Sequence, residues 1–288
     1  MSNLVNRFAP FDEKLAAALE ANVAAALAED IGGGDVTGRL VPEDKIAKAC
    51  VIVREPAVLC GAPWFEAVMK RIDPRLTIDW CYAEGDDLQA KMQVCWVEGP
   101  ARSLLTAERT ALNFLQLLSG VATATRKFVQ LVAGTKAEIM DTRKTFPGLR
   151  LAQKYAVRVG GGANQRMALY DGILIKENHI AAAGGITAAL QTAQALNAGV
   201  PVQVEVESLA QLQEALDGGA VSVLLDNFRL ENIREAVKLN TGRATLEVSG
   251  GVNIYSVRSI AETGVDRISV GALTKDLHAT DYSLRIFG

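Results

Sequence analysis

Residues 202–227 read VQVEVESLAQLQEALDGGAVSVLLDN, and this stretch decides the fold class. A short apolar segment ends at Glu205, a helical stretch follows from Leu209 to Leu216, and a second apolar segment ends at Asp226. A strand, a helix and another strand at this spacing indicate a βαβ unit with parallel strands. The stretch therefore predicts a parallel α/β sheet.

The same alternation continues on both sides of this stretch. Short apolar segments also end near Asp141, Lys176, Val248 and Val270, and further helical stretches lie at 186–196 and 230–239. Six such strands that close on themselves would form an incomplete (β/α) barrel with fewer than eight strands. An open, doubly wound sheet is the alternative that this pattern leaves open.

The pattern differs before residue 119. Residues 12–30 predict an amphipathic helix that ends at a run of glycines, residues 48–100 contain β-rich segments at 49–53, 76–80 and 92–97, and residues 102–133 predict a long helix. We therefore expect an N-terminal α+β sandwich domain at 1–118, which ends in the long helix. An α/β barrel catalytic domain at 119–288 would follow, and whether the extreme C-terminus packs back on the first domain stays open.

Composition and charge exclude several classes of protein. The chain has 288 residues and a net charge of -3, so it lacks the basic character of a nucleic-acid-binding protein. Its four cysteines are far apart and form no C-x-x-C, which is typical of reduced thiols in a cytosolic protein. The start resembles no signal peptide, and no apolar run reaches the roughly 20 residues that span a bilayer. We expect a cytoplasmic protein with no membrane partner.

The carboxyl ends of the predicted strands carry polar, charged or glycine residues in succession. They are Asp141 to Thr145, Lys176 to Asn178, Glu205, Asp226 with Asn227, Ser249 to Gly251, and Gly271. In α/β barrels the active site lies at this end of the strands, and open sheets follow a similar rule. A single polar residue after a strand is usually solvated, but so long a series predicts one functional site.

Two carboxylates and two glycine segments suggest what this site binds. Glu205 and Asp226 each belong to an otherwise apolar strand, so they are expected to face the mouth of the barrel, where they could bind a ribose diol or Mg²⁺. Ser249-Gly250-Gly251 and Ser269-Val270-Gly271 follow the last two strands and predict a phosphate site, because glycine lets a phosphate approach backbone N–H groups. Ordinary turn glycines are the alternative.

Cationic side chains add to this prediction. The candidates are Arg109, Arg143, Lys144, Arg166 and Lys176. Together they suit a ligand with several carboxylates or phosphates, because Arg binds carboxylate in a fork and Lys acts as a point charge. The chain has only two histidines and contains no G-x-G-x-x-G after a strand, no Walker A sequence and no G-x-S-x-G.

Several motifs, in order, resemble the quinolinate phosphoribosyltransferase (carboxylating nicotinate-nucleotide pyrophosphorylase) family. They are 108–113 (ERTALN), 141–145 (DTRKT), 174–179 (LIKENH), 204–207 (VEVE), 225–227 (LDN), 249–251 (SGG) and 269–274 (SVGALT). The resemblance extends from about Glu29 nearly to the end. It implies an N-terminal α+β domain with an incomplete barrel of the type II phosphoribosyltransferase kind.

The resemblance also implies a reaction and roles for residues. A pentosyltransferase of this family joins quinolinate to the phosphoribosyl group of 5-phosphoribosyl 1-pyrophosphate with decarboxylation, uses Mg²⁺, serves NAD biosynthesis and forms a homodimer or an assembly of dimers. Arg109 would reach the neighbouring subunit's site, and Glu205 and Asp226 would meet the ribose and metal. Quinolinate and pyrophosphate would be held by Thr142, Arg143, Lys144, Arg166 and Lys176. The 5-phosphate would be held by Ser249, Gly250, Gly251, Ser269, Val270 and Gly271. Lys144, Glu205 and Asp226 would be catalytic.

One departure and three rival interpretations remain. Where the family usually has Asn-His-Arg, this chain has Asn164-Gln165-Arg166, and glutamine cannot carry charge. Lys176 could instead form a Schiff base in an aldolase-like barrel. The chain could also be a paralogue with another aromatic acid as acceptor, or a non-catalytic sensor of phosphosugars.

Overall fold

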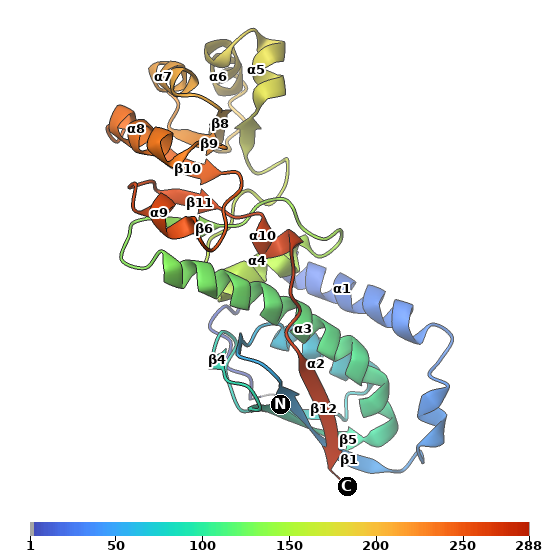
Figure 1. Ribbon diagram of the computed structural model, residues 1–288. Coiled ribbons are helices and arrows are strands. Elements are labelled where there is room, and N and C mark those ends of the chain that lie inside the picture. The colour runs from blue at the N-terminus through green and yellow to red at the C-terminus, as the bar shows by residue number, and fades with distance from the viewer. Residues whose placement is uncertain (1–2, 288) are drawn as a thin grey trace. The chain divides into compact units, whose positions relative to one another are not determined.

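The computed structural model describes residues 3–287, which divide between two compact units. The first unit takes the described residues of Met1–Arg126, Thr145–Gly161 and Asp276–Gly288, and the second takes Lys127–Lys144 and Gly162–Lys275. Figure 1 shows the order of the elements along the chain. The sequence predicted one boundary at 118/119, whereas the chain enters the first unit three times.

The first unit is an antiparallel sheet with helices. Its four-stranded sheet has the order β12-β1-β5-β3, and β2 pairs with β4 separately. The strands are β1 (Ile46–Val53), β2 (Ala57–Val58), β3 (Thr77–Trp80), β4 (Asp87–Leu88), β5 (Gln93–Pro100) and β12 (Tyr282–Phe287), and the helices are α1 (Glu13–Ile31), the 3₁₀ helix η1 (Thr37–Leu40), α2 (Ala62–Ile72), most of α3 (Ala101–Leu131) and α4 (Arg150–Val159).

Local sequence explains why these helices form. The side chain of Asp12 accepts a hydrogen bond from the backbone N–H of Leu15 at 2.8 Å and so caps α1. Leu15, Leu19, Val23 and Leu27 recur on one face of α1 and are buried, as the periodicity predicts, because α1 packs against α2 and α4. The sequence analysis missed α2 and α4, which are only 11 and 10 residues long.

Glu84 is the one fully buried acid of the first unit with a strongly raised pKa among the described residues. Its carboxylate accepts from the N–H groups of Gly61 and Ala62, at 2.8 and 3.1 Å, and from the hydroxyl of Tyr155 at 2.9 Å. These bonds favour the charged form, but burial outweighs them and raises the pKa of Glu84 to about 7.

We therefore expect Glu84 to make unfolding depend on pH. Because the pKa of Glu84 is raised in the folded state, its contribution to the free energy of unfolding is fully present below about pH 4.5. As the pH rises to about 7, this contribution is lost, which lowers the free energy of unfolding by on the order of 3 kcal/mol. Urea unfolding of Glu84→Gln should lack this decrease, whereas Glu43→Gln, at an exposed site, should retain it. Parallel stability curves for the wild type and Glu84→Gln would contradict this prediction.

The second unit is a six-stranded parallel sheet with helices outside it. The strands are β6 (Glu138–Met140), β7 (Ile173–Ile175), β8 (Val202–Val206), β9 (Ser222–Asp226), β10 (Thr245–Ser249) and β11 (Arg267–Ser269), and the helices are α5 (Glu177–Ala183), α6 (Ile186–Ala195), α7 (Leu209–Asp217), α8 (Leu230–Asn240), α9 (Val257–Ala261) and α10 (Ala272–Lys275). Every pair of neighbouring strands is parallel, in the order β6-β11-β10-β9-β8-β7.

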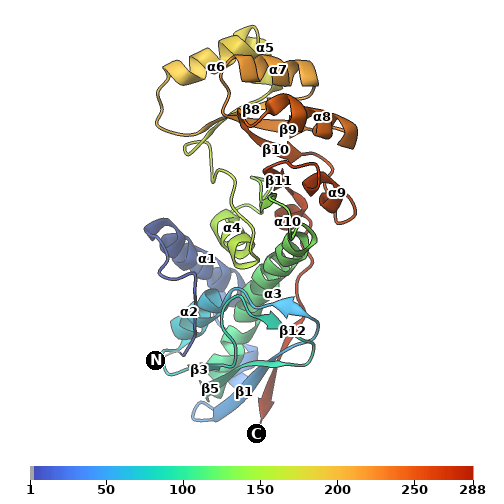
Figure 2. The ribbon, with the colours of Figure 1, turned by 90° about the vertical axis from the view of Figure 1, so that its left-hand side faces the viewer.

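This order decides between the two predicted architectures. From β7 to β11 each new strand is added on the same side, and β6 then lies beside β11, so the order never reverses as it does in a doubly wound sheet. Consecutive helices from α5 to α9 also contact each other. Figure 1 shows α5, α6, α7 and α8 in succession beside β8 and β9, which Figure 2 shows from another side. The predicted incomplete barrel is therefore confirmed.

The barrel stays open between β6 and β7, which are the two edges of the sheet. The free edge of β6 is partly covered by the segment after α4, because Ala163 donates to the carbonyl of Ile139 at 2.8 Å and accepts from the N–H of Asp141 at 3.1 Å. This segment continues to Gln165 and Arg166. Because the barrel has six strands rather than eight, the opening between β6 and β7 leaves room for this loop, which carries Arg166 of the predicted site.

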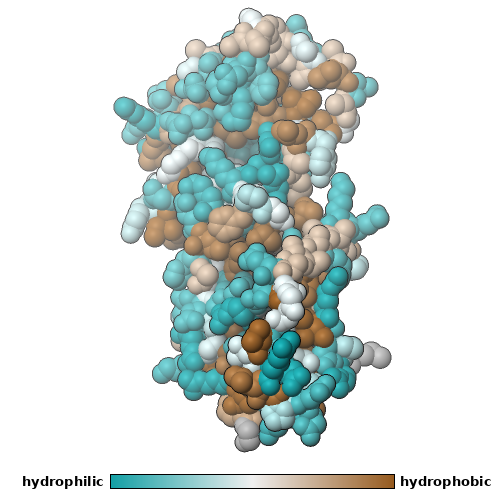
Figure 3. Space-filling view, turned by 90° about the vertical axis from the view of Figure 1, so that its right-hand side faces the viewer, coloured by the Kyte–Doolittle hydropathy of each residue, from teal (hydrophilic) through white to brown (hydrophobic). Residues whose placement is uncertain are grey.

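No helix in residues 3–287 is long and apolar enough to cross a membrane. On the face drawn in Figure 3, hydrophilic and hydrophobic residues are interspersed.

All four cysteines are free thiols, and Cys50, Cys60 and Cys95 are buried. The predicted absence of disulfides is therefore consistent with the structure.

Candidate active site

A cavity of about 430 Å³ lies at the carboxyl ends of the parallel strands. Its wall consists of Thr142, Arg143, Lys144, Gln165, Arg166, Leu174, Lys176, Glu205, Leu224, Asp226, Asn227, Glu247, Ser249, Gly250, Gly251 and Ser269. Most of the residues predicted from strand ends are therefore together on this wall. All of them belong to the second unit.

Strand register explains why the two predicted carboxylates face the same space. Glu205 on β8 is paired with Leu224 on β9, and Asp226 follows two residues later on the same side of β9. The Glu205 carboxylate is ion-paired with the Lys176 ammonium at 3.0 Å, and only 10% of the Glu205 side chain is exposed. Asp226 accepts from the amide of Asn227 at 2.7 Å. The acids therefore line the interior at successive depths.

The cationic residues come from the two loops that flank β6 and the open edge. Thr142 accepts from the N–H of Lys144 at 3.1 Å, and Thr274 donates to the carbonyl of Lys144 at 2.8 Å, so the loop after β6 is held at both sides of Arg143. Burial, and then the nearby charge of Arg143, lower the pKa of Arg166 from its ordinary value. Arginine nevertheless stays protonated, so these two guanidinium groups bring positive charge to one side of the cavity.

The glycine segment after β10 needs glycine for a structural reason. Gly250 has φ of +96°, and a Cβ there would lie 2.8 Å from the backbone nitrogen of Asn227. Gly251 also has positive φ, and no atom lies within 4 Å of where its Cβ would be. Gly250 thus permits close packing of two loops, while Gly251 leaves backbone open to the cavity, as the predicted phosphate site requires.

Three predicted residues are not on the wall. Val270 is 1% exposed and belongs to the core, where its N–H donates to the carbonyl of Met140 at 2.9 Å. A Cβ at Gly271 would lie 3.3 Å from Cδ of Lys144, so Gly271 lies just behind the wall. Arg109 is exposed on α3 in the first unit, and its predicted place in a partner's site stays a prediction.

Glu247 and Gln203 are polar residues of the interior that were not among the predicted site residues, whereas Asp141 was predicted as the start of the polar segment after its strand. All three are buried, and Glu247 is 0% exposed. Glu247 belongs to the strand Leu246-Glu247-Val248, which has the same alternation that drew attention to Glu205. The same reasoning would therefore have selected Glu247 on β10, which is two strands away from β8 in the sheet.

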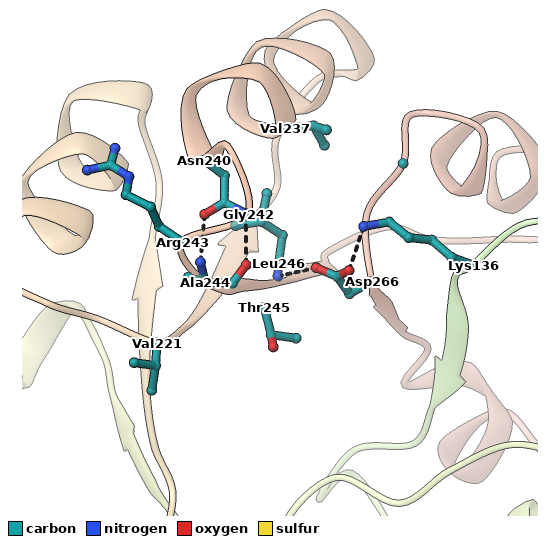
Figure 4. Close-up of a pocket in the computed structure, with 11 residues that line it drawn as sticks. Lys136, Val221, Val237, Asn240, Gly242, Arg243, Ala244, Thr245, Leu246 and Asp266 are labelled. Carbon is teal, nitrogen blue, oxygen red and sulfur yellow. Dashed lines mark hydrogen bonds and ion pairs between the residues drawn. The ribbon is translucent and has the colours of Figure 1, made fainter.

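A second cavity, of about 350 Å³, lies at the opposite ends of the strands (Figure 4). Its polar groups are paired: the Asp266 carboxylate accepts from the Lys136 ammonium at 2.6 Å and from the N–H of Leu246 at 2.8 Å. Asn240 donates to the carbonyl of Ala244 at 2.8 Å and accepts from its N–H at 2.9 Å. Residues at this end of a barrel serve stability, so we place the active site in the other cavity.

Asn240 supports a prediction about stability. Asn240→Ala should lower the free energy of unfolding by about 1–3 kcal/mol, because it removes the partners of two buried backbone groups of Ala244. Turnover should be unchanged. Asn232→Ala, on the exposed face of the same helix, is the control in urea unfolding, and equal stability of the two variants would refute the role of Asn240.

Family models assign the chain. The C-terminal domain model of quinolinate phosphoribosyl transferase matches residues 121–285, and the N-terminal domain model matches residues 35–119. The chain belongs to the quinolinate phosphoribosyltransferase family. The residues that match the C-terminal domain model, 121–285, include every residue of the cavity wall.

Individual members of the family agree with this assignment. The carboxylating nicotinate-nucleotide pyrophosphorylase of Mycobacterium leprae is 42% identical over 269 residues, which cover 90% of this chain and 94% of that protein. The chloroplastic enzyme of that name from Oryza sativa is 39% identical, with 93% of this chain and 77% of that protein covered. The solved structure of the Francisella tularensis nicotinate-nucleotide pyrophosphorylase has a TM-score of 0.92 and 46% identity, and it covers 94% of this chain and 96% of that one.

Proposed function

We propose that this chain transfers the phosphoribosyl group of 5-phosphoribosyl 1-pyrophosphate to quinolinate. The products are nicotinate mononucleotide, pyrophosphate and CO₂, in NAD biosynthesis. Membership of a family named for this reaction supports the proposal. The observation that carries it for this chain is that cations, three carboxylates and a glycine segment line one cavity.

The cationic loops are suited to the acceptor and the leaving group. Quinolinate carries two carboxylates and pyrophosphate several negative charges, and the two substrates repel each other. Arg143 and Arg166 provide forked donors for carboxylates, and Lys144 provides a point charge for a phosphate. These positive charges would attract both anions and offset the repulsion between them, which would bring the reacting atoms together.

The acidic strand ends are suited to the ribose and to Mg²⁺. Glu205 and Asp226 are the acids of adjacent strands, and residues 3–287 contain no group of three or more ligating side chains that could hold a metal alone. This donor set fits Mg²⁺, which uses one or two carboxylates together with substrate phosphates. Bound there, Mg²⁺ would neutralise charge on the departing pyrophosphate. Lys176 would position Glu205 through their ion pair.

The remaining wall is suited to the 5-phosphate. Ser249 ends β10 and is followed by Gly250 and Gly251, and Ser269 ends β11, which lies beside β10. The hydroxyl of Ser249 and open backbone N–H groups are neutral donors that bind phosphate without placing more charge near the anomeric carbon. The 5-phosphate would then fix the ribose with its reactive carbon toward the cationic loops.

The chemistry needs no covalent enzyme intermediate. The pyridine nitrogen bonds to the anomeric carbon as the bond to pyrophosphate breaks, and the electron pair leaves with pyrophosphate. In the resulting pyridinium, the electron pair of the bond between C2 and its carboxylate stays on C2 as CO₂ departs, where the adjacent positive nitrogen stabilises it, and a proton then adds at C2. The cations would supply electrostatic stabilisation of the leaving group.

We also propose a homodimer or an assembly of dimers in the cytoplasm. A dimer would bring Arg109 of one protomer to the cavity of the other, a role that the family resemblance implies and that its exposed position on α3 permits. Four free cysteines favour a reducing compartment, although the rice relative is named chloroplastic. Sedimentation of the purified chain and fractionation of its cells would test these two proposals.

The decisive assay mixes the purified protein with quinolinate, 5-phosphoribosyl 1-pyrophosphate and Mg²⁺ and follows CO₂ and nicotinate mononucleotide together. We expect equal amounts of both products. We expect no product with nicotinate as the acceptor and no product after chelation of Mg²⁺. Turnover of another aromatic acid would identify a paralogue. Binding of both substrates without product would identify a sensor.

A further inference from the structure

A hydrogen-bonded set of side chains forms the floor of the cavity. We call Gln165, Gln203, Glu247 and Ser269 the polar layer. Gln203, Glu247 and Ser269 come from β8, β10 and β11 and are 8%, 0% and 4% exposed. Gln165 comes from the segment that covers the free edge of β6. The polar layer therefore joins the barrel wall to the loop at its open side.

Glu247 is the acceptor in all of its contacts within the polar layer. Its carboxylate accepts from the amide nitrogen of Gln165 at 3.1 Å, from the amide nitrogen of Gln203 at 2.9 Å and from the hydroxyl of Ser269 at 2.5 Å. Both amides therefore point their NH₂ groups toward Glu247. Since a carboxylate only accepts, its presence fixes which way each amide is turned.

The direction of the Gln165 amide in turn fixes the next residue. With its nitrogen toward Glu247 and Gln203, the Gln165 side-chain oxygen faces the backbone and accepts from the N–H of Arg166 at 2.7 Å. The N–H of Gln165 donates to the Asp141 carboxylate at 3.0 Å. Arg166 thus enters the cavity from a backbone that is held on both sides of residue 165.

Packing alone does not explain a carboxylate in this place. Burial of an acid is costly unless hydrogen bonds offset it, and among the described residues the partners of Glu247 are two amides and a hydroxyl, with no cation. An apolar side chain would fill the same space at lower cost. It would leave both glutamines free to turn.

We propose that Glu247 is a positioning residue of the transfer reaction. Its carboxylate sets the direction of the Gln165 amide and, through it, the place of Arg166 at the substrates. The proposal rests on the proposed function for its kinetic part, while its structural part, the hydrogen bond from Arg166 to Gln165, can be measured without any substrate.

Glu247→Gln is the direct test, because it keeps the size and removes one acceptor. Either Gln165 or Gln203 must then turn, and we expect kcat/KM for quinolinate to fall by about 10- to 100-fold, since small displacements of a binding group cost this much. The amide resonance of Arg166 in an NMR spectrum should move and exchange faster. Glu235→Gln, an exposed change of the same kind on α8, should alter neither.

An exchange of the two residues gives the sharper test. The double variant Gln165→Glu/Glu247→Gln still has one carboxylate and two amides. If the amide of Gln203 turns, every group again has a hydrogen-bond partner, and the N–H of Arg166 again has an acceptor. The double variant should recover kcat/KM to within about threefold and restore the Arg166 resonance, which is the non-additivity expected of coupled residues.

The outcomes separate the two proposals. Unchanged Arg166 resonance and unchanged kcat/KM in Glu247→Gln would overturn the positioning role. A wild type that never turns over quinolinate, but whose Arg166 resonance responds as described, would overturn the proposed function alone. If Glu247→Gln does not fold, Gln165→Met must show the same loss of kcat/KM and the same change at Arg166, and normal values there would overturn the proposal.

Discussion

Replacement of Lys144 by alanine should lower kcat/KM by at least about a hundredfold while the fold survives, which is the usual cost of removing one group that stabilises a transition state. Lys144 is exposed and lines the cavity, where its charge meets the anionic leaving group in the proposed reaction. Because pyrophosphate gains charge as it departs, the loss should fall mainly on kcat.

Steady-state kinetics and thermal unfolding of the same preparations test this expectation. Lys238→Ala removes another exposed lysine of the second unit, on α8 and away from the cavity wall, and should retain full activity. Both variants should unfold at the wild-type temperature. A Lys144→Ala enzyme with near-normal kcat/KM would remove Lys144 from the site.

Arg166→Ala should also cost at least about a hundredfold in kcat/KM, but through a different parameter. The Arg166 guanidinium is half-buried beside Arg143, and one of its nitrogens donates to the carbonyl of Gly172 at 2.9 Å. It can therefore offer a fixed, forked donor to a carboxylate of quinolinate. We expect KM for quinolinate to rise more than KM for 5-phosphoribosyl 1-pyrophosphate.

Arg166→Lys separates charge from geometry. Lysine keeps the charge but lacks the fork, so its kcat/KM should lie between those of the wild type and Arg166→Ala. Guanidinium added to Arg166→Ala should restore part of the activity, while Arg234→Ala, at an exposed position on α8, should need no rescue. A rise in KM for the phosphoribosyl donor alone would assign Arg166 to the other substrate.

The sequence predicted most of the second unit because its strands and helices alternate with distinct periods. The predicted helices at 186–196, 209–216 and 230–239 correspond to α6, α7 and α8 within one residue at each end. It left the choice between barrel and doubly wound sheet open, since both produce the same alternation along the chain. Only the pairing of β6 with β11 distinguishes them.

The site was predictable where a charged residue lies at the carboxyl end of a strand or directly after it. Lys176, Glu205 and Asp226 were predicted in this way, and they line one cavity. Glu247 lies two residues before the end of β10 and was not predicted, although its strand alternates as β8 does, because its role depends on partners that are far away in the sequence. Those partners, Gln165, Gln203 and Ser269, are 82, 44 and 22 residues away.

The first unit is completed by β12. This strand pairs along β1, from Lys48 with Phe287 to Val53 with Tyr282, although β1 ends at Val53 and β12 begins only at Tyr282. During synthesis on the ribosome, β1 therefore emerges early and keeps an open edge until residues 282–287 have been made. A nascent chain that stalls before residue 282 would present that edge to other chains, so a nonsense mutation before residue 282 should cause aggregation rather than a merely shortened enzyme.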